Sequence, residues 1–128
     1  MSATLEATKL AAFNDSIRQG LPQIVADLRG RLGAKLVAYI ANVTETRAVR
    51  SWVDGERTPA PNTERRLRLA FQVATLIDRS EGDGVAATWF QGMNPQLGDR
   101  SPARVLHEDR TDEAMAQVLA AAKGFVGA

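Results

Sequence analysis

The stretch LGAKLVAYIANVTETRAVRSWVDGE, residues 32–56, decides the fold that we expect for this chain. Apolar residues recur at helical spacing in two segments of it, which predicts short helices over about residues 34–40 and 45–53. Between them, Asn42 can take the left-handed conformation that a tight turn needs, and Thr44 can cap the second helix. Two short helices joined in this way are typical of a helix-turn-helix.

The surface of the second helix predicts what the pair does. In a helix-turn-helix this element enters the major groove of DNA, where arginine pairs with guanine and threonine contacts bases or a thymine methyl group. Trp52 is spaced with the apolar face and is assigned to the core. The residues expected at bases are Thr44, Glu45, Thr46, Arg47, Arg50 and Ser51, and those expected at phosphates are Arg57, Arg65 and Arg66. In the alternative interpretation, the pair belongs to an ordinary helical bundle and its arginines are solvated charges.

Helical patterns continue outward from this segment. A loop over residues 55–62 contains two prolines and a glycine, and Thr63 can cap a long helix through about Ile77. The apolar arc of this helix is wide, so we expect the basic region to cover one side and the C-terminal segment or a second protomer to cover the other. Ser101 followed by Pro102 predicts one further helix start and Thr111 predicts the last, with Gly124 and residues 127–128 as a frayed or partner-ordered tail.

Composition and charge support an all-α globular chain with two kinds of surface. The chain has 128 residues, 45% hydrophobic and 24% charged, and strand-like alternation is nearly absent. Residues 18–68 hold ten Lys or Arg against five Asp or Glu, whereas residues 69–128 hold five against eight. We therefore expect an N-terminal extension at residues 1–20, a basic helix-turn-helix region at 21–78 and an acidic partner-binding region at 79–128.

The sequence contains none of the usual signs of catalysis. It has no cysteine and one histidine, His107, and no P-loop, dinucleotide fingerprint or nucleophile motif. We expect no enzyme activity, no catalytic residue, no metal and no cofactor. The N-terminus lacks a leader pattern and no run of apolar residues is long enough for a membrane span, so we expect a cytoplasmic location.

Two segments resemble the Xre-type antitoxins of the MbcA/ParS group. The first is residues 32–56, although Asn42 stands where that group usually has glycine, and the second comprises ERRLRLAFQVATLI at 64–77 and TWFQGMNPQLGDRSPARVL at 88–106. Together these cover roughly residues 21–126. The resemblance implies a helix-turn-helix bundle followed by a small helical toxin-binding region.

The resemblance also implies partners. The chain would neutralise a RES-domain toxin that consumes NAD, and dimers or higher toxin–antitoxin complexes would bind their own operator DNA. In that group the C-terminal segment, here from about Ala114 to Ala128, lies near the entrance of the toxin active site. The residues implied in toxin binding are Trp89, Phe90, Asn94, Pro95, Leu97, Arg100, Ser101, Met115, Val118 and Phe125.

Two other functions remain open from the sequence. One is a stand-alone Xre-like transcriptional regulator without a toxin, and the other is a helical protein-binding adaptor that does not contact DNA. Several residues of the second segment also have a purely structural explanation, because Ser101 and Pro102 form a helix start and Trp89 with Phe90 can belong to the core.

Overall fold

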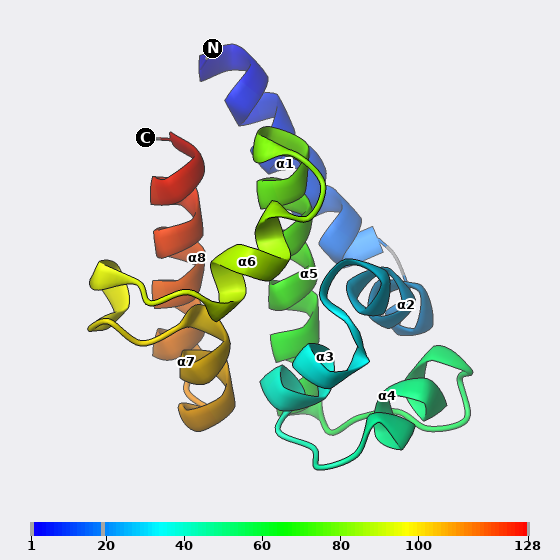
Figure 1. The fold of residues 1–128 in the computed structure, drawn as a ribbon. Helices are drawn as coiled ribbons and strands as arrows, with labels where there is room; N and C mark the ends of the chain where they lie inside the picture. Colours follow the sequence, from blue (N-terminus) through cyan, green and yellow to red (C-terminus); the bar gives the residue numbers. More distant parts are fainter. Residues whose placement is uncertain (1, 19, 128) are drawn as a thin grey trace.

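The computed structural model describes residues 2–18 and 20–127, and every regular element within them is helical (Figure 1). The prediction of an all-α fold is confirmed. In chain order the elements are α1 (Ser2–Arg18), α2 (Leu21–Leu32), α3 (Ala34–Ala41), α4 (Thr46–Val53), α5 (Pro61–Glu81), α6 (Val85–Gln91), the short 3-10 helix η1 (Pro95–Leu97), α7 (Pro102–Glu108) and α8 (Asp112–Gly127).

Helix α5 is the central element of the bundle. Helices α1, α2, α3, α6 and α8 all pack against it, so its wide apolar arc is covered from both halves of the chain. Leu67 and Phe71 are almost completely buried in this packing. The C-terminal segment, through α8, provides the second cover that the sequence predicted.

The start of α5 differs from the expected cap at Thr63. The helix begins at Pro61, because a proline in the first turn loses no hydrogen bond there and its φ angle already suits a helix. Thr63 is buried within the helix, and its hydroxyl accepts a hydrogen bond from Arg110 at 3.2 Å. The helix also continues past Ile77 to Glu81, where Gly82 takes a positive φ of 118°.

The turn between α3 and α4 has the predicted geometry at Asn42. This residue lies in the left-handed region, with φ 59° and ψ 44°, and its amide donates to the carbonyl of Tyr39. Helix α4 begins one residue later than expected, because Glu45 occupies the cap position. The prediction that the Thr44 side chain caps this helix is therefore wrong.

Side-chain caps define the C-terminal helices. The Ser101 hydroxyl accepts from the amide of Arg104 and the Thr111 hydroxyl accepts from the amide of Ala114, both at 3.1 Å, which confirms the two predicted helix starts. The predicted tail is wrong where the structure describes it, since α8 continues through Gly124 to Gly127. Ala128 lies outside the described residues.

One hydrophobic core joins the two halves of the chain. It extends without a break from Leu21 in α2 to Ala122 in α8, and it includes residues of every helix from α2 to α8. Helix α1 adds to this body by packing along α5, and Ala12 is almost completely buried there. Within the described residues, no helix is both long enough and apolar enough to span a membrane.

Candidate nucleic-acid interface

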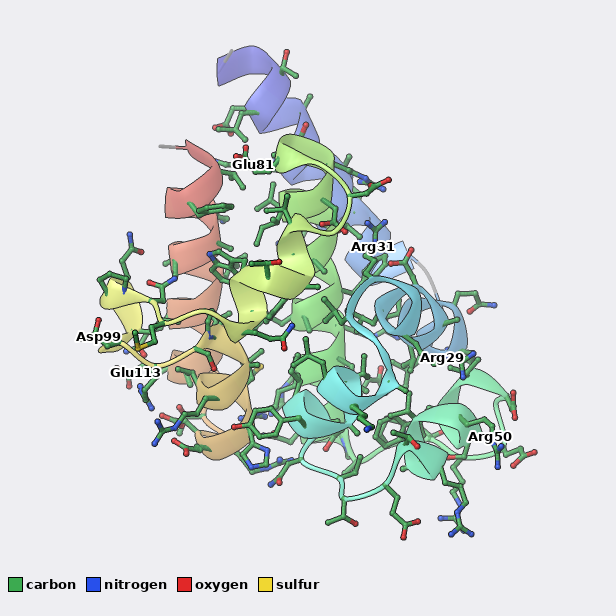
Figure 2. The ribbon with its side chains drawn as sticks, viewed as in Figure 1. Arg29, Arg31, Arg50, Glu81, Asp99 and Glu113 are labelled. Atoms are coloured by element: carbon green, nitrogen blue, oxygen red, sulfur yellow. The ribbon has the colours of Figure 1, made fainter. Side chains whose placement is uncertain are left out.

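Helix α4 lies at one end of the molecule (Figure 1). Val49 is fully buried and Trp52 is 6% exposed, and these two residues anchor the helix to the core, as predicted for Trp52. With this face held inward, Thr46, Arg47 and Arg50 are exposed. Figure 2 shows Arg50 pointing outward at this end. The arrangement leaves a short helix with a polar ridge available to a partner.

One side of this ridge is a hollow of about 390 Å³ between α4 and the chain that precedes and follows it. It brings together most of the residues that the sequence predicted for DNA contact: Thr44, Glu45, Arg47, Arg50, Ser51 and Arg57. Glu56 also lines it, so carboxylates lie among the arginines.

The Glu45 carboxylate forms an ion pair on the surface. The Arg47 guanidinium lies 3.1 Å from Glu45, and the two side chains are 75% and 64% exposed. An exposed ion pair of this kind contributes little free energy, so Arg47 can exchange Glu45 for another acceptor at small cost. Ser51 is less available, because it is half-buried and its hydroxyl donates to the carbonyl of Ala48 at 2.6 Å.

The other side of the ridge contains an arginine that the sequence prediction missed. A second hollow, of about 250 Å³, is lined by Arg29, Ala34, Thr46, Arg47 and Arg50. Arg29 comes from the last turn of α2, and Figure 2 shows it at the same end of the molecule as Arg50. The sequence offered one signal for Arg29, since it is one of two arginines in the last turn of α2. Only the packing of α2 against α4 places it at this site.

Arg65 and Arg66 of α5 were both predicted to contact phosphates, and the structure rules out such a contact for Arg66. Arg66 is fully buried, and its guanidinium donates to the carbonyls of Leu106 and Asp109. The prediction that Arg66 contacts DNA is therefore wrong. Arg65 is exposed but faces α8, where its guanidinium lies 3.6 Å from Asp112, and it lines neither hollow beside α4.

Four residues predicted to bind a toxin belong to the core, namely Phe90, Leu97, Met115 and Val118. Phe90 and Val118 are fully buried and Leu97 is 3% exposed, so these predictions are wrong for this conformation. Their apolar character and helical spacing suit a core position as well as an interface. Met115 is also mostly buried, at the edge of a groove between α1, α5 and α8.

Two of the aromatic residues predicted to bind a toxin, Trp89 and Phe125, remain accessible and form a small patch. Trp89 of α6 and Phe125 of α8 are in contact, with ring centroids 6.4 Å apart, and Phe125 is 41% exposed. We call this pair the α6–α8 patch. Met93, which sequence reasoning missed, follows α6 and is 82% exposed.

The polar residues of the same predicted site build the loop that carries η1. The Asn94 carboxamide accepts from the amide of Gln96, and the Asn94 amide donates to the carbonyl of Arg100. The Arg100 guanidinium donates to the carbonyl of Leu97, and Ser101 caps α7. Pro95 is exposed in the first position of η1.

His107 joins the two halves of the molecule. Its ring stacks on Tyr39 of α3, with centroids 4.0 Å apart, and its Nδ1 lies 2.7 Å from the Tyr39 carbonyl oxygen. This contact holds α7 against the end of α3, next to the turn that leads into α4. In the described part of the chain, no group of three or more carboxylate, histidine or cysteine side chains is arranged to hold a metal ion.

Comparison of the chain with protein-family models, with curated proteins and with solved structures gave no match. The function is therefore inferred from the geometry around α4 and from the resemblance carried by residues 32–56, 64–77 and 88–106.

Proposed function

We propose that the α3–α4 pair acts as a helix-turn-helix and that this chain binds duplex DNA through α4 to regulate transcription. The observation that carries the proposal is the outward projection of Thr46, Arg47 and Arg50 from a short helix that Val49 and Trp52 anchor. A ridge with hollows on both sides suits the major groove, since the inserted helix then has a phosphate backbone on each side.

We also propose that the chain is the antitoxin of a type II pair and that it binds a RES-domain toxin through the α6–α8 patch. The resemblance of residues 64–77 and 88–106 to MbcA/ParS antitoxins supports this. The patch supplies exposed aromatic surface, which is enriched at protein interfaces. Figure 1 shows the C-terminal part of α8 and α4 at opposite ends, so one chain can hold DNA and a protein together.

A pair of reciprocal variants tests both proposals. Arg47→Ala combined with Arg50→Ala should lower affinity for the DNA upstream of the reading frame and flatten its dependence on salt concentration, because two cations that face the duplex are lost. The same protein should still neutralise the toxin. Phe125→Asp should keep the affinity for DNA and lose toxin neutralisation, because a charge in the patch opposes burial against the toxin.

Binding to labelled duplex over a salt series and growth during co-expression with the adjacent toxin gene provide the two measurements. Lys123→Ala on α8 is the charge control for DNA binding, and Leu10→Asp, at an exposed apolar residue of α1, is the control for the patch. If the wild-type chain binds no duplex, the function that remains is that of a protein-binding adaptor. A chain that binds its upstream DNA but no RES-domain protein would be a stand-alone regulator.

A further inference from the structure

The hollow between α2, α3 and α4 has an unusual charge composition. Among the residues that the structure describes, three guanidinium groups line it, from Arg29, Arg47 and Arg50, and no carboxylate does. The hollow on the other side of α4 also has three arginines, but Glu45 and Glu56 lie among them. The α2–α4 side is therefore the more electropositive side of the ridge.

The two arginines at the end of α2 have different surroundings. Arg31 is paired with Asp27 and with the buried carboxylate of Asp78. The Arg29 side chain has no hydrogen bond or ion pair with any residue that the structure describes, and it lines the hollow instead. It is only partly exposed, so packing already limits the freedom of its side chain and less entropy is lost when it binds.

Helix α3 begins at the same hollow. Ala34 is its first residue, and Gly33 before it provides no side-chain cap for the first amides of the helix. Unpaired amides at a helix start favour an anion. Combined with three guanidinium groups, they make a site suited to a tetrahedral oxyanion, because the planar guanidinium donates two parallel hydrogen bonds to such a group.

We infer that Arg29 and Arg50 bind a backbone phosphate of duplex DNA in the α2–α4 hollow, which holds one strand beside the inserted helix α4. The inference rests on the proposed DNA binding and adds a phosphate site to it. A phosphate contact fixes the position of a protein on DNA and carries no direct sequence information. Arg29 therefore sets affinity and the depth of α4 in the groove, whereas Arg47 is left to read bases.

The variant Arg29→Ala tests the inference. Its affinity should fall by the same factor for the upstream duplex and for a scrambled duplex of equal length, and the salt slope should decrease by about one. Arg29→Lys should restore the slope, because the charge returns, while part of the affinity stays lost with the guanidinium fork. Lys123→Ala, which removes one exposed charge at the far end of the molecule, should change neither quantity.

The outcomes separate the two proposals. If the wild-type chain binds neither duplex, the proposed DNA binding fails and the phosphate site fails with it. If it binds and Arg29→Ala leaves affinity and slope unchanged while circular dichroism shows an intact fold, only the phosphate site fails. A loss confined to the upstream duplex would make Arg29 a base-reading residue and overturn the inference. Weaker binding of inorganic phosphate in Arg29→Ala with unchanged DNA binding would assign the hollow to free phosphate and overturn it as well.

Discussion

At the scale of single residues, the neighbouring Arg65 and Arg66 of α5 differ in burial because different groups surround them. Arg66 lies in the interior, where its guanidinium donates to the carbonyls of Leu106, at 3.1 Å, and Asp109, at 2.8 Å, and also to Asn62. Two of these acceptors belong to the last turn of α7 and its cap, where carbonyls have no partner within the helix. Burial and the nearby Arg110 and Arg65 lower the pKa of Arg66 from its ordinary value.

Arg66→Ala should lower the free energy of unfolding by about 3 kcal/mol, because buried carbonyl groups lose a charged donor and a cavity remains. Urea denaturation followed by circular dichroism measures this loss. Arg65→Ala is the matched control, one residue away and exposed, and should change stability by less than about 0.5 kcal/mol. Equal losses in the two variants would contradict the structural role assigned to Arg66.

At the scale of elements, the Asp78 carboxylate positions a helix that is too short to form alone. Helix α6 has seven residues, and its second amide, that of Ala86, donates to Asp78 Oδ1 at 2.9 Å. The other carboxylate oxygen accepts from Arg31 of α2 at 2.9 Å. One buried side chain of α5 thus connects the helix that precedes the α3–α4 pair with the start of the C-terminal region.

Asp78→Ala should destabilise the chain by about 3 kcal/mol, since it leaves a buried amide without an acceptor and removes the buried partner of Arg31. Asp78→Asn should cost less, because its oxygen can still accept from Ala86. Chemical denaturation compares these variants with Asp83→Ala, which changes an exposed carboxylate that lines a hollow together with Asp78, Arg31 and Asp27. A loss in Asp83→Ala as large as that in Asp78→Ala would argue against a specific role for the buried carboxylate.

At the scale of the whole molecule, the two tryptophans report on opposite halves of one core. Trp52 anchors α4, and Trp89 lies on α6 against Phe90 and Phe125. Because the hydrophobic core continues from α2 to α8, we expect the halves to unfold together although they face different proposed partners.

The variants Trp52→Phe and Trp89→Phe each leave a single fluorescent reporter. In each variant, the urea midpoint from tryptophan fluorescence should coincide with the midpoint from far-ultraviolet circular dichroism. The comparison is made within one variant, so any loss of stability caused by the substitution affects both probes equally. Separate midpoints would show that residues 21–78 and 79–128 unfold as independent units.

Features that depend on a few adjacent residues were predictable from the sequence by itself. Helical spacing of apolar residues, the left-handed turn at Asn42 and the helix starts at Ser101 and Thr111 all follow from local backbone and capping chemistry. The same local reasoning predicted most of the residues that line the hollow at α4.

Only the tertiary structure decided which residues of one chemical type are buried and which meet. Arg66, expected at a phosphate, lies in the interior, whereas Arg29, which the sequence did not single out, lies beside α4. Phe90 and Val118 became core residues while Phe125 stayed accessible. The physical reason is that burial and pairing are set by contacts with residues distant along the chain, here the packing of α7 on the start of α5 and of α2 on α4, which local periodicity does not contain.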